Sequence, residues 1–255
     1  MKRRLLSSKT RRAEPTSEFD YLPTEILLEI FKGLSSQELR KCAGVCKRWR
    51  TLVGSLLNVD CVFVCDVTKS VRTYWEALVY ELSVQFIVND TVRYGFVGYT
   101  DHYPDNRVVT SFPLTWKTDQ LSTELYEIQL GEGRDYPEAV LDGLYTALNL
   151  NWRPNSTKVC VLICDSPPHG RRFMTEEFKY NDEFADGCPC GLSEEYVFKT
   201  FAEMGVTCYM LHTHPNLEKV AEKFREYCPG LESSLVEYQN FSDPISEILG
   251  RFRVH

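Results

Sequence analysis

Three continuous apolar runs of strand length constrain the fold of this chain more than any other feature. They cover residues 61–65 (CVFVC), 159–164 (VCVLIC) and 206–211 (VTCYML), and residues 94–99 are a further candidate strand. An unbroken apolar run is typical of a parallel strand that is buried on both faces, because helices cover both sides of a parallel sheet. The runs therefore predict an α/β fold.

Amphipathic patterns occupy the segments between these runs. A second helix is expected from Pro137 to Leu148, and others over 194–204, 217–227 and 244–252. Together these patterns predict a sheet with helices on both faces. The clearest pattern has apolar residues at helical spacing, namely Val71, Tyr74, Trp75, Leu78, Val79, Leu82 and Phe86.

A separate helical pattern precedes the first strand. Pro23 opens a helix with one apolar face, and Ser35 with Glu38 predicts a capping box that starts a second helix. A third helical segment follows from Cys46. Helices this short cannot bury so many large apolar side chains among themselves, because the segment has too little interior. Either the following domain or a partner protein covers the remainder.

The run LPTEILLEIFKGLSSQELRKCAGVCKRWR, residues 22–50, resembles an F-box. The resemblance implies an adaptor that docks on a Skp-type linker protein and so joins a cullin-based ubiquitin ligase. It also implies an F-box over residues 18–54, after a basic disordered tail at 1–17. The partner-binding positions that it implies are Leu22, Pro23, Ile26, Leu27, Ile30, Phe31, Leu34, Leu39, Val45 and Trp49.

The charge distribution bears on partners and compartment. The first twelve residues hold six cations and no acid, so the rest of the chain carries −13 against a formal net charge of −7 overall. A body this acidic repels phosphate backbones, which argues against nucleic acid as a partner. No apolar segment is long enough to span a bilayer, so we expect no membrane association and a cytoplasmic location. The basic tail leaves a nuclear location open.

Most of the ten cysteines lie inside the apolar runs, where a reduced thiol behaves as a small hydrophobe. Cys188 and Cys190 instead form a C-x-C pair in a predicted loop. No second pair stands at the spacing of zinc ligands, so the sequence favours zinc only weakly.

Acidic residues follow the predicted strands at the edge of the sheet where ligands bind in this fold class. Asp66, Asp101 and Asp165 come just after strands, and Thr68 and Ser70 add hydroxyls in the run DVTKS. Hard oxygen ligands from separate loops are what Mg²⁺ requires. The alternative is structural, because Asp66 or Ser70 could cap the next helix and Asp165 could form a turn.

Residues 59–255 resemble a von Willebrand factor A domain, which has a Rossmann-like sheet with helices on both faces. Asp66, Thr68 and Ser70 match the D-x-[ST]-x-S of its metal-ion-dependent adhesion site, and Asp165 matches the later aspartate. The resemblance implies Mg²⁺ at these four residues, with Asp101 and Asp135 as further candidate ligands. The runs GYTDHYPD, GEGRDYPEAVLDGL, DSPPHG and GLSEEYVF are similar to the A domains found beside alpha-kinases.

One departure from the family pattern concerns the middle loop of the site. The usual threonine has no clear counterpart there, and Asp135 stands in that region instead. Asp135 could serve as an oxygen ligand. It could also cap the helix expected from Pro137, with Glu138 completing a capping box.

No catalytic constellation stands out. His212 and His214 lack an acidic partner motif, and Cys164 ends a buried run in which a thiol is inert. The F-box and the A domain leave no room for a kinase domain. We therefore expect a non-enzymatic adaptor of a ubiquitin ligase whose A domain binds a substrate protein. The alternatives are a scaffold that does not support ubiquitination and a component of an alpha-kinase-related pathway.

Overall fold

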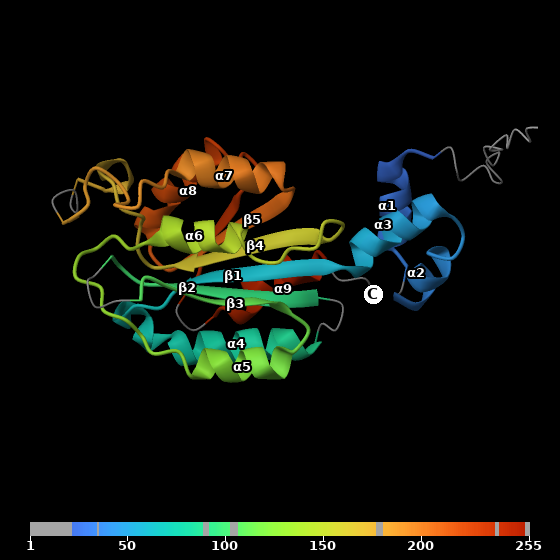
Figure 1. The fold of residues 1–255 in the computed structure, drawn as a ribbon, viewed down its shortest axis with the longest axis horizontal. Coiled ribbons are helices and arrows are strands. Elements are labelled where there is room, and N and C mark those ends of the chain that lie inside the picture. The colour runs from blue at the N-terminus through green and yellow to red at the C-terminus, as the bar shows by residue number, and fades with distance from the viewer. Residues whose placement is uncertain are drawn as a thin grey trace, which may run out of the picture.

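The computed structural model describes residues 22–34, 36–88, 92–102, 107–176, 181–237 and 240–252. Its larger part is a twisted sheet between two layers of helices (Figure 1), as the apolar runs predict. The strand order is β3-β2-β1-β4-β5-β6, and all neighbours are parallel except β2 and β3. The strands are β1 (Val59–Asp66), β2 (Val92–Tyr99), β3 (Val109–Thr115), β4 (Thr157–Cys164), β5 (Val206–His212) and β6 (Glu232–Leu235).

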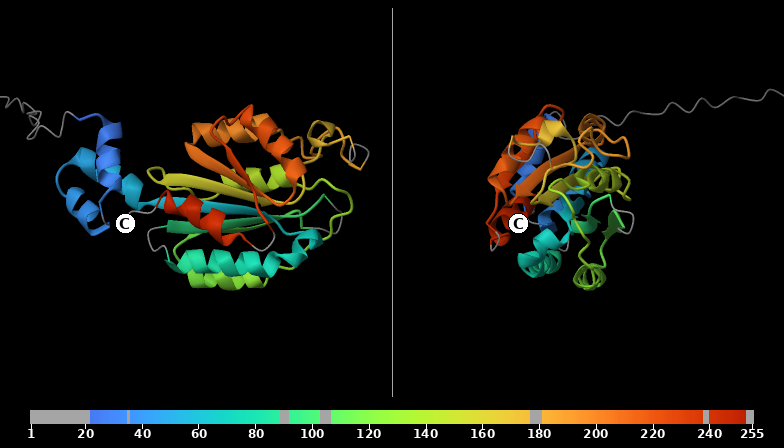
Figure 2. Two further views of the ribbon diagram at one scale, coloured as in Figure 1. Left: turned by 180° about the vertical axis from the view of Figure 1, so that it is seen from behind. Right: turned by 90° about the vertical axis from the view of Figure 1, so that its left-hand side faces the viewer.

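The alternating side chains of β1 supply two separate cores, which explains its unbroken apolar sequence. Cys61, Phe63 and Cys65 point into one core, while Val62 and Val64 point into the other. Helices α4 (Trp75–Val88), α5 (Thr118–Tyr126) and α9 (Ser242–Gly250) cover the first face. The second face is covered by α6 (Val140–Leu148), α7 (Glu194–Glu203) and α8 (Glu218–Arg225), as Figure 2 shows from two further sides.

Two expected helices begin later than their sequence patterns indicate. Residues Lys69–Thr73 form a 3₁₀ turn, η2, before α4 begins at Trp75. Helix α6 begins at Val140 and not at Pro137, because Glu138 pairs in extended form with the chain at Pro168. The expected capping box is therefore wrong. The carboxylate of Asp135 instead accepts the N–H of Glu183 at 2.6 Å.

Three elements escape the sequence patterns. Strand β3 is an edge strand that contains Pro113 and is mostly only half-buried, so it lacks the apolar signature of the central strands. Strand β6 has four residues, and α5 has only two fully buried side chains. Each element is placed by the sheet or helix that it packs against.

The amino-terminal module consists of α1 (Thr24–Lys32), α2 (Ser36–Cys42) and α3 (Lys47–Leu57). Its core contains Leu27, Phe31, Leu39 and Val53, with the Trp49 ring set edge-on to Phe31 at a centroid distance of 5.0 Å. The Cys46 sulfur caps α3 by accepting the Trp49 N–H. Ser35 of the expected capping box and the basic tail lie outside the described residues.

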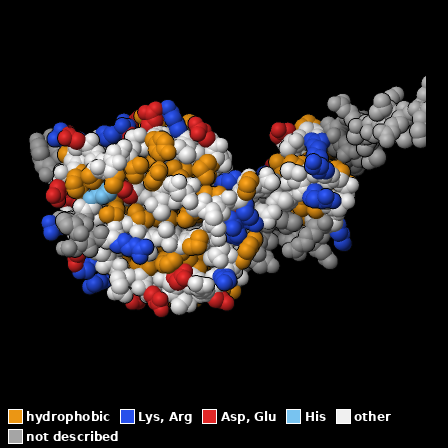
Figure 3. Space-filling view, viewed as in Figure 1, with side chains coloured by type: hydrophobic (Ala, Val, Ile, Leu, Met, Phe, Trp, Pro, Cys, Tyr) orange, Lys and Arg blue, Asp and Glu red, His pale blue; other side chains and the backbone are white. Residues whose placement is uncertain are grey.

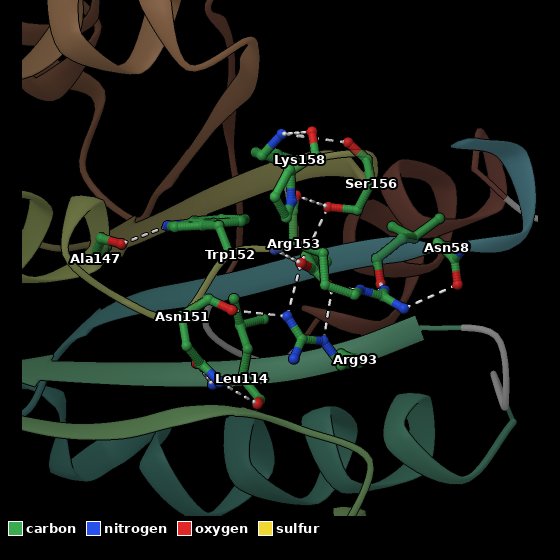
Figure 4. A network of polar contacts seen from close by, with 12 residues as sticks. Asn58, Arg93, Leu114, Ala147, Asn151, Trp152, Arg153, Ser156 and Lys158 are labelled. Carbon is green, nitrogen blue, oxygen red and sulfur yellow. Dashed lines mark hydrogen bonds and ion pairs between the residues drawn. The ribbon is translucent and has the colours of Figure 1, made fainter. Parts of the chain in front are cut away.

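Helix α3 runs to Leu57 and β1 starts at Val59, so only Asn58 joins the two parts of the chain. The Asn58 carbonyl accepts the N–H of Thr157, and its side-chain oxygen accepts a hydrogen bond from Arg153, both at 2.9 Å (Figure 4). Arg153 also binds the buried carboxylate of Asp60. This network holds the connecting residue in place. Within the described residues, no helix is long and apolar enough to cross a membrane.

Candidate metal centre and docking face

The candidate metal centre lies where the order of the parallel strands reverses. Strands β1 and β4 are neighbours in the sheet, yet their connections lead to opposite faces. A crevice forms at such a switch point, outside the carboxyl ends of the strands. Asp66 is the last residue of β1, and Asp165 follows the last residue of β4. The topology therefore places the two carboxylates side by side.

Asp66, Thr68 and Ser70 form one hydrogen-bonded set. Oδ1 of Asp66 accepts both the backbone N–H and the hydroxyl of Thr68, each at 2.7 Å. The hydroxyls of Thr68 and Ser70 lie 2.8 Å apart. This Asx turn agrees in part with the expectation that Asp66 has a structural role, because one of its oxygens stabilises the turn before η2. The other oxygen, Oδ2, is buried and has no hydrogen-bond partner.

The electrostatics of Asp66 call for a cation. Burial raises the pKa of Asp66 well above its ordinary value, and the adjacent Asp165 carboxylate raises it further. The nearby Lys69 does not relieve this repulsion, because its ammonium pairs with Glu132 at the surface. An unpartnered buried oxygen, a second carboxylate and two hydroxyls make a donor set that fits Mg²⁺.

Glu138 is a further buried acid near this site, which the sequence patterns did not identify. Its side chain is buried, and Oε2 has no hydrogen-bond partner. Burial and the charges of four aspartates, Asp66 first, raise the pKa of Glu138 to about 11. The sequence analysis assigned Glu138 to a capping box. Its position, in the loop that lacks the expected threonine, was the signal that could have identified it.

Gly131 brings the Glu138 loop close to the Asp66–Ser70 turn. Its N–H donates to the carbonyl of Val67 at 2.8 Å, and its carbonyl accepts the N–H of Lys69 at 2.9 Å. A Cβ on Gly131 would lie 2.5 Å from Cγ2 of Thr100, so only glycine fits this close approach. The loop is thus paired directly with the DVTKS segment.

The other two candidate ligands gather around His169. Nε2 of His169 lies 2.8 Å from Asp101, and Nδ1 lies 3.0 Å from Asp182. Asp135 is the third member of a group with Asp101 and His169 whose donor atoms lie within 4.8 Å of one another. Burial lowers the pKa of His169, but the two aspartates outweigh burial and raise it. His169 thus links Asp101 and Asp182 through its two ring nitrogens.

Groups considered for catalysis have structural partners. His212 ends β5, where its ring contacts the carbonyl of His214 at 2.9 Å and the carboxylate of Glu218 at 3.2 Å. These contacts tie the strand end to α8. Burial raises the pKa of the Cys164 thiol well above its ordinary value, and the nearby carboxylates add to the shift.

The structure divides the ten positions implied for the F-box face. Leu27, Phe31 and Leu39 are buried in the module's own core, and Leu22, Leu34 and Trp49 pack against it. Pro23, Ile26, Ile30 and Val45 remain exposed, with 48% of Ile26 and 44% of Ile30 accessible. Apolar and basic side chains are both visible on the module (Figure 3).

Pro23, Ile26 and Ile30 recur at a spacing of three and four residues, so they lie on one side of the first helix. We call these three residues the α1 face. It is exposed apolar surface, because the larger domain does not cover it. The sequence left open whether the larger domain or a partner protein covers these helices. The exposed α1 face favours a partner protein.

Known proteins resemble both the amino-terminal module and the larger domain. A family model described as F-box-like matches residues 19–57. The alpha-protein kinase vwkA of Dictyostelium discoideum is 28% identical over 160 residues, which are 60% of this chain and 25% of that protein. The chain thus spans only a quarter of that kinase.

Solved structures show the same fold as the larger domain. Proximal thread matrix protein 1 from the mussel byssus, with a zinc-occupied MIDAS motif, superimposes with a TM-score of 0.52 at 14% identity. The match covers 75% of this chain and 45% of that chain, and a second crystal form gives 0.50. The chain therefore carries an F-box-like segment followed by a domain of the von Willebrand A fold, as the two sequence resemblances imply.

Proposed function

We propose that this protein is a substrate receptor of a cullin-type ubiquitin ligase. The F-box-like segment docks on a Skp-type linker protein, and the von Willebrand A domain binds the protein to be modified. The α1 face is the observation that carries this proposal. Its residues remain exposed after the module has completed its own core, so they are available to a linker protein.

The arrangement of the two parts suits an adaptor. The F-box-like helices lie next to the amino end of β1, and the candidate metal centre lies at its carboxyl end (Figure 1). The eight residues of this extended strand place its two ends about 23 Å apart. The Asn58 network fixes the connection. A protein bound at the metal centre would thus be held at the far end of the A domain from the linker.

Asp66, Thr68, Ser70 and Asp165 are the residues that would hold Mg²⁺. The ion would supply an open coordination position for a carboxylate of the bound protein. The chain's own residues orient this position, because the Asx turn fixes Asp66 and Thr68 relative to each other. The unpartnered Oδ2 of Asp66 is the atom that supports cation binding.

We propose binding and not catalysis as the activity of the A domain. His212, His169 and Cys164 each have structural roles that account for their position. The match to vwkA covers a quarter of that kinase, and it supports an alternative role in an alpha-kinase-related pathway. Activity of purified protein towards a general kinase substrate would favour that alternative.

The docking proposal is tested by capturing a purified Skp-type linker protein on the full-length chain. Ile26→Asp with Ile30→Asp places two charges on the α1 face, so we expect at least about a hundredfold loss of affinity. The matched control is Ile87→Asp on α4, since Ile87 is also exposed, at 70%. Undiminished capture by the double variant, with circular dichroism showing intact helices, would refute docking through this face.

Ubiquitination then separates an adaptor from a scaffold. The captured complex is supplied with a cullin, a RING subunit and the conjugating enzymes. Modified substrate or self-modified receptor is expected with wild type and is lost in the α1 face variant. A complex that assembles but stays unmodified would support the scaffold role.

Calorimetry with Mg²⁺ and Mn²⁺ tests the metal centre. Wild type should bind either ion, while Asp66→Ala removes a carboxylate ligand and should abolish the heat of binding. Asp119→Asn, at an exposed position on α5, is the control with an unchanged site. Absence of wild-type heat would refute the metal centre and leave docking through the α1 face untouched.

A further inference from the structure

A second group of metal-binding side chains lies outside the site described above. It consists of His102, Asp142, Cys188 and Cys190, which we call the His102–Cys190 cluster. His102 follows β2, Asp142 lies in the first turn of α6, and both cysteines come from the connection between β4 and α7. Three separate segments thus bring together one imidazole, one carboxylate and two thiols.

The donor atoms of this cluster lie at metal-site distances. Nε2 of His102 is 3.0 Å from Oδ2 of Asp142, and Sγ of Cys188 is 3.0 Å from the same oxygen. Sγ of Cys188 is 3.4 Å from Nε2 of His102, and all four donors lie within 4.8 Å of one another. Tetrahedral Zn²⁺ separates its nitrogen, oxygen and sulfur ligands by about 3.4 to 3.8 Å. The donor atoms of His102, Asp142 and Cys188 need to move apart by only about half an ångström or less to reach these separations.

We propose that His102, Asp142, Cys188 and Cys190 form a tetrahedral zinc site. Four protein ligands complete the coordination shell, as in structural zinc sites. The donors select against Mg²⁺ and Ca²⁺, because those ions prefer oxygen ligands whereas thiolates and imidazole favour zinc. The C-x-C pair alone, without its two other ligands, favoured zinc only weakly. The tertiary structure supplies its two missing partners.

The hydrogen bonding supports a cation at this place. Three donors, from His102 and the two thiols, converge on the Asp142 carboxylate. Thiols are weak donors, whereas the strong hydrogen bonds to a buried carboxylate come from charged groups. The neighbouring His169 shows the contrast, since each of its ring nitrogens has a carboxylate of its own. The contacts of the His102–Cys190 cluster therefore gather an imidazole nitrogen and a thiol around one oxygen of Asp142.

The cysteine loop is shaped for coordination. The N–H of Gly191 donates to the carbonyl of Cys188 at 2.9 Å, and Gly191 has a φ of +74°, which favours glycine. The backbone N–H of Cys190 donates a hydrogen bond to the Cys188 sulfur. Cys190 is exposed, so an ion can reach the cluster from solvent.

Zinc would fasten this loop to the A domain at the same edge as the candidate metal centre. His169 already attaches the loop to Asp101 beyond β2, and Asp182 holds His169 from within the loop, where it also accepts the N–H groups of Gly170 and Phe184. The zinc site is a second attachment, further along the loop. It would fix the position of the chain that leads into α7.

The test is metal analysis of the full-length protein loaded with zinc and desalted, together with cobalt substitution. Wild type should retain zinc, and Co²⁺ should give the strong visible and near-ultraviolet bands of thiolate-bound tetrahedral cobalt. Cys190→Ser changes an exposed residue and should preserve the fold. It should lower zinc affinity at least about a hundredfold, because even changes outside the ligand shell cost ten- to a hundredfold.

Two controls locate the ion. Asp66→Ala removes the other metal centre, which has no thiol, and should leave the cobalt–thiolate bands unchanged. Cys42→Ser removes a thiol from the F-box-like module and should also leave them unchanged. The zinc site would be overturned if wild type lacks the thiolate bands, or if Cys190→Ser and Cys188→Ser retain wild-type zinc affinity.

Discussion

Replacing Asp60 by Asn tests the buried charge network at the junction. Asp60 is fully buried, and its carboxylate accepts two hydrogen bonds from the Arg93 side chain, each at 2.9 Å. Arg153 adds two more, from its backbone N–H at 2.7 Å and its side-chain Nε at 2.8 Å. The Asn variant keeps the shape of the side chain but leaves both guanidinium groups without a counter-charge.

Breaking a buried ion pair from one side costs about 3–5 kcal/mol. The side chains of Arg93 and Arg153 are 11% and 25% exposed, so water relieves part of the loss and we expect about 3 kcal/mol. For a domain of this size that is a fall of about 6–12 °C in melting temperature. Urea unfolding at pH 7, followed by circular dichroism, measures the change. Asp119→Asn, at an exposed site, should change stability by less than about 0.5 kcal/mol.

The pH dependence of this loss has a definite sign. Burial raises the pKa of Asp60, but hydrogen bonds from Arg93 and Arg153 outweigh burial and hold it below 3.8. The folded state therefore binds the proton less tightly than the unfolded chain, and the stabilisation is complete above that value. It is lost as the pH falls through the lower folded-state pKa. The free energy of unfolding of wild type should exceed that of the variant by the same amount at pH 7 and pH 5.5. A difference below about 1 kcal/mol at pH 7 would refute the reasoning.

Two further substitutions test packing. Phe31→Ala leaves a cavity in the core of the F-box-like module and should lower the free energy of unfolding by about 3–5 kcal/mol, whereas Ile26→Ala on the exposed α1 face should lower it by less than about 1 kcal/mol. Hydrogen exchange of α1 measures both losses, and equal losses would contradict the division between core and face. Gly143→Ala would place a Cβ 2.6 Å from Cδ1 of Tyr99. We expect about 1–3 kcal/mol of destabilisation in thermal unfolding, and an unchanged melting temperature would show that α6 is free to shift.

The central elements were predictable because their signals are local. Strand β1 reads as an apolar run since both of its faces are buried, and Asp66, Thr68 and Ser70 meet within one turn. Edge strand β3 carries no comparable signal, because only one edge and part of one face are covered. The predicted start of α6 at Pro137 is wrong, because pairing of Glu138 with Pro168 overrides the local capping pattern.

Periodicity and short motifs in the sequence determined the parallel sheet, its two helical layers, the F-box-like helices and the Asp66 turn, because each depends on residues close together in the chain. Tertiary structure decided which distant groups meet. Glu138 joins the aspartates, and Cys188 meets His102 across 86 residues, because the strand order reverses between β1 and β4 and opens one edge to several loops. Such convergence follows from packing, and no local pattern records it.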